Sequence, residues 1–240
     1  MLDNIKLENI LFLDIETVPQ LPDYDQLDDD FKKLWDKKAA YISKEDESSK
    51  DCYGRAGIYS EFGKIVCISA GYIYYEGVQK CFKVKSFYGN NEKQLLSDFL
   101  DMLRKFDTND QKLLCAHNGK EFDFPYIARR CLINGLKIPS IIDIAGKKPW
   151  EVKHLDTMEL WKFGDFKNYT SLELLAKVFN IPTPKDDIDG SQVAEVYYVE
   201  KNVERIAIYC EKDVLTIAQL VLRYKGENLI PEECVESIRK

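Results

Sequence analysis

The sequence has few of the residues that build zinc sites and disulfide frameworks. Its 240 residues include only two histidines, His117 and His154, and its seven cysteines are scattered with no Cys-x-x-Cys pair. Zinc sites need closely spaced Cys and His ligands, so none is expected here. Most cysteines stand in apolar surroundings, as Cys67 does in IVCIS, and we expect reduced core residues. Both histidines are expected to be structural.

The chain also lacks an excess of basic residues and any long apolar run. It has 34 lysines and arginines against 41 aspartates and glutamates, a formal net charge of -7 at pH 7. Holding nucleic acid by charge alone requires Lys and Arg to neutralise phosphates, so that class is disfavoured. An enzyme that grips a short strand through bound metal ions is not excluded. No apolar run reaches membrane-spanning length, and acids near the N-terminus replace the apolar core of a signal peptide, which predicts a cytoplasmic location.

The stretch Ile10–Pro19, ILFLDIETVP, is predicted to be a central strand that carries two acids. Its leading apolar residues favour a strand buried on both faces, and Pro19 cannot donate to a sheet ladder. Asp14 and Glu16 are two residues apart, so their side chains point to the same face. Adjacent carboxylates repel unless a cation lies between them, and hard oxygen ligands suit Mg²⁺ or Mn²⁺. Taken alone, the pair also fits an acidic strand end in water.

The rest of the chain predicts a single domain over residues 1–240. Residues 20–62 are the least regular region, and Phe31, Leu34 and Trp35 have helical spacing there, so we expect a helical insertion near the mouth of the site. Strands come first and then alternate with helices, which predicts a mixed β-sheet flanked by helices in an α/β fold. The expected strands are 64–74, 78–88 and 112–117, with a turn at Glu76-Gly77. The expected helices are 91–106, 126–134, 170–179 and 191–225. Asn90 or Asn91 should cap the first helix and Thr170 the third, and the last helix should break near 201–202. Residues 180–190 are expected to form a loop.

Two further groups of polar residues are candidates for the same site. Asp123, in HNGKEFDFPY, follows a buried strand and begins a helix, so its carboxylate can reach the sheet edge where the first two acids lie. Tyr209 and Asp213 are four residues apart in a long helix and share one face, where a phenol beside a carboxylate can orient a water molecule. Each group has a simpler structural explanation when taken alone, since acids are common at helix N-termini.

Together the three motifs resemble the DEDD superfamily of 3′-5′ exonucleases. LDIET resembles the first motif, HNGKEFDFP the second, and YCEKD the third motif of the tyrosine (DEDDy) subgroup, in the same order along the chain. The surroundings are most similar to the proofreading exonuclease domain of family B DNA polymerases, over most of the chain apart from residues 20–62. The histidine subgroup would need a His just before Tyr209, where this chain has Ile208. The resemblance implies an RNase H-like sheet.

The resemblance also implies a two-metal catalytic site. The ions would be Mg²⁺ or Mn²⁺, one helping to activate water and the other stabilising the leaving 3′-oxygen. Tyr209 would position the attacking water. The residues expected to hold the ions are Asp14, which would bridge them, Glu16, Asp123 and Asp213. The acid Asp156, in HLDTMELW, is expected to be a structural residue at a strand end.

The implied substrate is a single-stranded 3′ end of DNA, from which nucleoside 5′-monophosphates are released. Thr17, Asn118 and Phe122 match positions that contact the terminal nucleotides in the family. The chain stops at Lys240, before any polymerase domain, so we expect a free-standing nuclease or a nuclease subunit. Its acidic surface predicts weak grip unless a protein partner supplies basic surface.

Three alternatives remain open from the sequence. An exoribonuclease resembling RNase D is one, because no residue clearly tests the sugar 2′-hydroxyl. A non-catalytic single-strand-binding protein on a nuclease fold is disfavoured, because all four carboxylates and the tyrosine are present. An RNase H-like endonuclease fits poorly with Tyr209 and Asp213 on a late helix.

Overall fold

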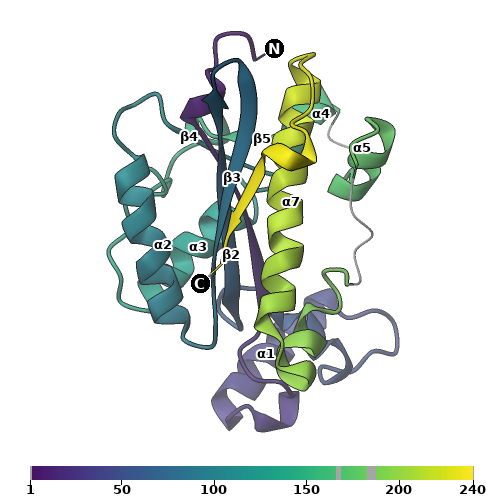
Figure 1. The fold of residues 1–240 in the computed structure, drawn as a ribbon. Coiled ribbons are helices and arrows are strands. Elements are labelled where there is room, and N and C mark those ends of the chain that lie inside the picture. Colours follow the sequence, from purple (N-terminus) through teal and green to yellow (C-terminus); the bar gives the residue numbers. More distant parts are fainter. Residues whose placement is uncertain (1, 166–168, 183–187, 240) are drawn as a thin grey trace.

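The centre of the fold is a six-stranded mixed β-sheet with the strand order β5-β4-β1-β2-β3-β6 (Figure 1). The structure, a computed structural model, describes residues 2–165, 169–182 and 188–239. Strands β1, β2 and β3 pair antiparallel, whereas β4 runs parallel to β1, β5 to β4 and β6 to β3. The strands are β1 Ile10–Pro19, β2 Gly63–Glu76, β3 Gln79–Tyr88, β4 Leu113–Ala116, β5 Leu155–Asp156 and β6 Val235–Ile238. The predicted mixed α/β architecture is confirmed.

Helices cover both faces of this sheet. Figure 1 shows α2 and α3 on one side and the long helix α7 on the other. The α-helices are α1 Asp29–Ile42, α2 Glu92–Phe106, α3 Asp123–Ile133, α4 Thr157–Lys162, α5 Leu172–Val178, α6 Val193–Glu195 and α7 Val203–Tyr224. Short 3-10 turns include η3 Asp51–Ile58, and a π-helical turn, η5, spans Val196–Glu200. No helix in the described ranges is both long and apolar enough to cross a bilayer.

Strand β1 lies between β4 and β2, and apolar clusters on both sides of the sheet bury its two faces. Leu11 and Leu13 pack into the apolar cluster formed with α2 and α3, whereas Ile10 and Phe12 pack into the cluster formed with α7. Side chains alternate between faces along a strand. Asp14 and Glu16 have the same parity as Ile10 and Phe12, so they are directed towards the α7 side.

The helix ends follow their capping residues, with one correction. Asn91 caps α2 by accepting a hydrogen bond from the Gln94 amide, as predicted. The predicted Thr170 cap is wrong: Ser171 caps α5, because its Oγ accepts the Leu174 amide at 3.2 Å. The break before α7 is confirmed at Lys201, whose φ of 55° is left-handed, and Asn202 caps the helix that follows.

Two other details differ from the expectations, and one lies partly outside the described residues. The β2–β3 turn is Gly77-Val78, one residue later than predicted, because Gly77 supplies the positive φ of 61° that the turn requires. Strand β6 was not predicted; it is a four-residue, partly exposed edge strand with little apolar patterning. Residues 183–187 of the loop expected at 180–190 are not described.

Residues 20–62 pack around an aromatic cluster of their own. Helix α1 is capped by Asp28, whose carboxylate accepts the amides of Asp30 and Phe31. Trp35 on this helix is fully buried, lies edge-on to Tyr53 and Phe62, and donates from Nε1 to the Ser49 carbonyl at 2.7 Å. This cluster contains no residue of the sheet strands. We therefore keep the expectation that this region is an insertion with its own small core.

Substituting Trp35 tests whether the insertion can open separately from the sheet. Trp35→Ala removes the centre of the aromatic cluster and one hydrogen bond, and losses of this kind cost about 3–5 kcal/mol. We expect hydrogen exchange to accelerate in residues 20–62 while β1 to β4 stay protected, as measured by exchange mass spectrometry. Phe99→Ala, in the cluster under the sheet, is the control that should loosen the sheet as well. Equal loosening of both regions by Trp35→Ala would refute a separate core.

Candidate metal-dependent catalytic site

A cavity of about 1090 Å³ collects most of the residues that the sequence singled out. Strand β1, the loop before α3, and α7 all contribute to its lining. The predicted residues that line it are Asp14, Glu16, Asn118, Phe122, Asp123, Tyr209 and Asp213. These residues are separated by up to about 200 positions in the sequence, so their convergence is a property of the fold.

The β1 part of the site is a close group of possible metal ligands. Asp14, Glu16 and Cys210 offer one ligand atom each, and these atoms lie within 4.8 Å of one another. Glu16 is buried, and Asp14 is partly exposed towards the cavity. The Cys210 thiol lies 3.4 Å from both the Asp14 carbonyl oxygen and Asp14 Oδ2, to which it donates. Cys210 therefore holds the Asp14 carboxylate against α7.

Asp156 arranges the loop that brings Asp123 into the cavity. Its carboxylate accepts the amides of Asn118 at 3.0 Å and Lys120 at 3.1 Å, and it caps α4 through the Met158 and Glu159 amides. Four donors thus satisfy this buried acid, in agreement with its predicted structural role. The same loop makes a close approach at Gly119, where a Cβ would overlap the Ala116 side chain.

Asp123 is the first residue of α3 and is almost fully buried. Its Oδ1 is buried and has no hydrogen-bond partner within the described part of the chain. Burial raises the pKa of Asp123 to about 8, and the charge of Asp156 adds to the rise. A buried carboxylate oxygen without a donor is costly, and a bound cation would remove that cost.

The raised pKa values of the two acids on β1 also favour a bound cation. Burial raises the pKa of Asp14 well above its usual range, with repulsion from Asp123 and Asp213 adding to the effect. Burial also raises the pKa of Glu16, with further repulsion from Asp14 and Asp213. Mutual repulsion among carboxylates is what a divalent cation relieves. The oxygen-rich donor set therefore fits a hard divalent ion such as Mg²⁺ or Mn²⁺.

Helix α7 places its tyrosine and aspartate together, as the four-residue spacing predicted. Tyr209 and Asp213 share a side-chain hydrogen bond, and both line the cavity. Burial raises the pKa of the Tyr209 hydroxyl above its ordinary value, and the charge of Asp213 raises it further. The hydroxyl therefore keeps its proton at neutral pH and serves as a hydrogen-bonding group rather than a base.

The three predicted substrate contacts lie in different places. Asn118 has a left-handed backbone, with φ 62°, and its buried side-chain oxygen has no partner among the described residues. Phe122 lines the cavity and packs against Tyr126 at a ring distance of 5.3 Å. Thr17 follows Glu16 but does not line this cavity; its side chain hydrogen-bonds Tyr126. Its substrate contact stays a prediction.

The sequence did not identify Cys210, which contacts Asp14 beside the cavity, or several residues of the cavity lining, among them Tyr169 and Ile58. Cys210 had the appearance of a core cysteine, although its position beside Tyr209 in YCEKD was the available signal. Tyr169 lines the cavity with 69% of its surface exposed, but no local pattern marks it. Ile58, 52% exposed, reaches the cavity from η3, so part of the insertion does stand beside the site.

Both histidines have both ring nitrogens hydrogen-bonded within the fold. His117 contacts Thr157 Oγ1 and the Thr170 carbonyl, each at 2.9 Å, although it also lines the cavity. His154 accepts the Leu114 amide and lies 2.6 Å from the Ile141 carbonyl. These contacts support structural roles.

Comparison with known families matches most of the chain. A family model described as a predicted 3′-5′ exonuclease related to the exonuclease domain of PolB matches residues 58–234. The matched range includes Asp123, Tyr209 and Asp213. Asp14 and Glu16 precede it, so the geometry of the cavity is what associates them with the matched residues.

The curated relatives and the similar solved structure are DNA polymerases. The DNA polymerase of Pyrococcus glycovorans is 24% identical over 157 residues, covering 60% of this chain and 19% of the polymerase. DNA polymerase 1 of Pyrococcus abyssi is 23% identical over 192 residues, covering 72% and 23%. The family B DNA polymerase structure from Pyrobaculum calidifontis has a TM-score of 0.51 and 14% identity, covering 90% of this chain and 24% of that one. The chain spans less than a quarter of the length of these polymerases, and the structural likeness shows the shared fold.

The raised pKa values predict that the metal-free protein loses stability as pH rises. The pKa of Asp123 is about 8 in the folded protein, against about 3.9 for an unfolded aspartate. Between these values the folded state binds more protons than the unfolded state, so stability falls as pH rises and levels off above about pH 8. We expect the Tm in EDTA to fall from pH 5 to pH 8, and Mn²⁺ to raise the Tm more at pH 8 than at pH 6.

Asp123→Asn is the matched control for this pH dependence. It keeps the side-chain shape and removes the titrating proton, so the Tm profile should be flatter and the Mn²⁺ effect smaller. A Tm that rises with pH in EDTA, or a Mn²⁺ effect independent of pH, would contradict the electrostatic description of this site.

Proposed function

The chain belongs to the family of predicted 3′-5′ exonucleases related to the exonuclease domain of PolB, and on that premise we propose that it removes nucleotides from single-stranded DNA 3′ ends with the help of two divalent ions. The observation that carries the proposal is the convergence of four carboxylates and one tyrosine in a single cavity. They come from three separate segments of the chain. A binding protein on the same fold would have no need to place this many repelling carboxylates together.

The proposed metal ligands are the four acids of the cavity. Asp14, Glu16, Asp123 and Asp213 would hold two Mg²⁺ or Mn²⁺ ions, which, when bound, stabilise negative charge on the phosphate and lower the pKa of water. The Asp123 oxygen that has no partner among residues 2–165, 169–182 and 188–239 supports this assignment, and so do the raised carboxylate pKa values. The pairing of a tyrosine with Asp213 supports assignment to the DEDDy subgroup.

Tyr209 is proposed to orient the attacking water. Because burial and the neighbouring Asp213 keep its hydroxyl protonated, Tyr209 holds a water molecule by hydrogen bonding and does not take its proton. Its bond to Asp213 fixes the direction of the hydroxyl. The positions of both side chains are set by α7, a rigid 22-residue helix packed on the sheet.

The lining of the cavity supports a single-stranded substrate. Phe122 and the exposed Tyr169 offer aromatic faces on which an unstacked base can lie, and the Asn118 amide offers hydrogen bonds. A paired base would first have to leave its duplex to make these contacts. Thr17, next to Glu16, is retained as a proposed contact of the terminal nucleotide.

Digestion of labelled strands tests the activity and the choice of sugar together. We expect 5′-labelled single-stranded DNA to shorten from its 3′ end in Mg²⁺ or Mn²⁺ and to remain intact in EDTA. Asp14→Asn should lower the rate by roughly 10³-fold or more, because it removes a metal ligand while keeping the side-chain shape. Faster digestion of RNA than of DNA would overturn the choice of DNA.

Stability measurements separate loss of catalysis from loss of folding in this variant. Because the charge on Asp14 is disfavoured by burial and by its neighbours, Asp14→Asn should not lower the Tm of the metal-free protein at pH 8. Its Mn²⁺-induced rise in Tm should shrink. Full cleavage by Asp14→Asn, or no cleavage of DNA or RNA by the folded wild type in either metal, would refute the proposed function.

Tyr209→Phe tests the role of the hydroxyl separately from metal binding. We expect kcat to fall by roughly 10²-fold, within the range typical of lost proton-transfer or water-orienting groups, while the Mn²⁺-induced rise in Tm is unchanged. Single-turnover cleavage and thermal denaturation provide the two readouts. Tyr198→Phe, whose hydroxyl bonds the Pro19 carbonyl outside the cavity, is the matched control. An unchanged rate in Tyr209→Phe would remove this residue from the mechanism.

A further inference from the structure

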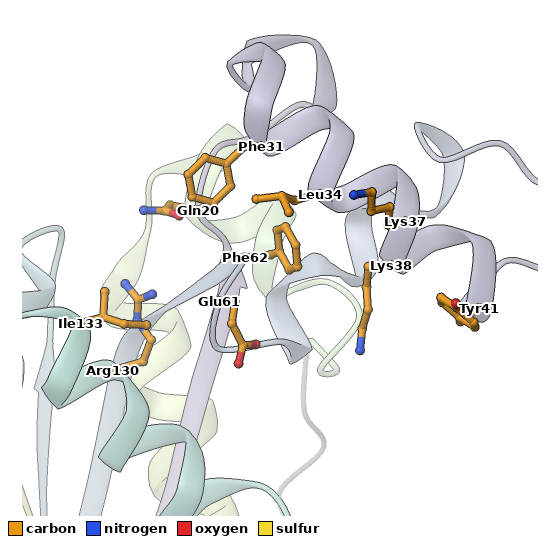
Figure 2. Close-up of a pocket in the computed structure, with 10 residues that line it drawn as sticks. All are labelled: Gln20, Phe31, Leu34, Lys37, Lys38, Tyr41, Glu61, Phe62, Arg130 and Ile133. Carbon is orange, nitrogen blue, oxygen red and sulfur yellow. The ribbon is translucent and has the colours of Figure 1, made fainter.

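A second cavity lies between the insertion and helix α3, and its volume is about 750 Å³ (Figure 2). We call it the α1–α3 groove. Its residues come from α1, from the segment before β2, from the end of β1 and from α3. They are Gln20, Phe31, Leu34, Lys37, Lys38, Tyr41, Glu61, Phe62, Arg130 and Ile133. None of them lines the catalytic cavity.

We infer that the α1–α3 groove binds the single-stranded nucleic acid that leads into the catalytic cavity, a few nucleotides upstream of the 3′ end. This inference rests on the proposed function, because it assumes that the strand end lies among the cavity carboxylates. Under this inference, the function of the insertion, residues 20–62, is to contribute substrate-binding residues beside the nuclease fold.

One face of α1 supplies both kinds of group that a single strand needs. Phe31, Leu34, Lys38 and Tyr41 are spaced at helical intervals and line the groove together with Lys37 (Figure 2). Tyr41 is 89% exposed. Phe31 is 37% exposed, and its ring lies edge-on to Phe62 at 6.3 Å. Aromatic faces beside lysines are typical of grooves that bind single strands, where bases stack and ammonium groups meet phosphates.

The positive charges available to attract an anion in the groove lie along α1. Arg130 is already satisfied by Glu92, with contacts of 2.8 and 2.5 Å, and by the Ser60 carbonyl. The basic groups that remain are therefore Lys37 and Lys38, and Lys38 Nζ lies 4.0 Å from the centre of the Tyr59 ring. Glu61 is the acidic residue of the lining. A phosphate chain should follow the lysines and avoid Glu61.

Strand β1 and helix α3 each run from the catalytic cavity to the groove, so residue spacing along them gives the distance between the two cavities. Along β1 and its continuation, Glu16 and Gln20 are four residues apart, or about 13 Å at the rise of a strand. Along α3, Asp123 and Arg130 are seven residues apart, or about 10 Å at the rise of a helix. At the 3.4 Å spacing of stacked bases these lengths correspond to at most roughly three or four nucleotides, and an unstacked strand covers them with fewer. A strand ending at the carboxylates is therefore long enough to enter the groove.

The length of the substrate provides the test. We expect Lys37→Gln/Lys38→Gln to raise the KM for a DNA dodecamer about tenfold and to leave the KM for a dinucleotide and both kcat values unchanged, because a dinucleotide is too short to reach the groove. Fluorescence anisotropy of the dodecamer with the Asp14→Asn protein should show the same weakening. The dependence of log affinity on log salt should flatten by roughly 0.7 for each lysine.

Three variants sharpen the interpretation. Glu61→Gln should tighten dodecamer binding, because it removes the acid of the lining. Tyr41→Ala should weaken it without loss of stability, because this ring is almost fully exposed. Lys6→Gln/Lys147→Gln changes the net charge equally at two exposed lysines outside both cavities, and should leave the KM unchanged.

The outcomes distinguish this inference from the proposed function. Cleavage with the same KM for dodecamer and dinucleotide in wild type and variants would overturn the inference and leave the exonuclease in place. A groove that binds an acidic, apolar peptide but shows no effect of its variants on the dodecamer would also overturn it, in favour of a protein-docking surface. Absence of cleavage of every strand by the folded protein would refute the proposed function itself.

Discussion

The repulsion among buried carboxylates is the constraint on which the rest of the structure depends. Burial raises the pKa values of Asp14, Glu16 and Asp123, and repulsion from neighbouring carboxylates adds to each rise, from Asp213 for the first two and from Asp156 for Asp123. Such a group is unfavourable in the absence of a cation, so the surrounding packing must hold it together. Strand β1 meets this requirement because it is a central strand with apolar clusters on both faces. The site is therefore placed where the backbone has least freedom to move the acids apart.

Other buried acids of the same fold have structural roles, and their carboxylates are fully hydrogen-bonded. Glu211, on the same helix as Tyr209 and Asp213, accepts hydrogen bonds from Ser86, Ser237 and Arg239. Asp156 accepts four backbone amides. Asp123 instead keeps one buried oxygen for which the described parts of the chain supply no donor. Full hydrogen bonding distinguishes acids that stabilise the fold from an acid that is kept available, and burial alone does not.

The sequence predicted the central parts of both the fold and the site, because these depend on local periodicity. The alternation in Ile10–Pro19 placed two acids on one face, and the four-residue spacing in α7 placed Tyr209 beside Asp213. Strand β6 was missed because an edge strand needs little apolar patterning. Tyr169 and Ile58 were missed because their positions beside the cavity follow from loop and turn geometry between distant elements, which no local pattern encodes.

Under the proposed function, the groove beside the insertion would allow an acidic chain to bind an acidic polymer. With a net charge of -7 and carboxylates at the proposed reaction centre, the cavity itself repels phosphates until cations are bound. The end of η3 and the segment after it line both cavities, with Ile58 in the catalytic cavity and Phe62 in the α1–α3 groove. Lys37 and Lys38 lie on α1 outside the catalytic cavity, so under the proposed function they would attract the strand without pairing with the acids that would bind the metal ions.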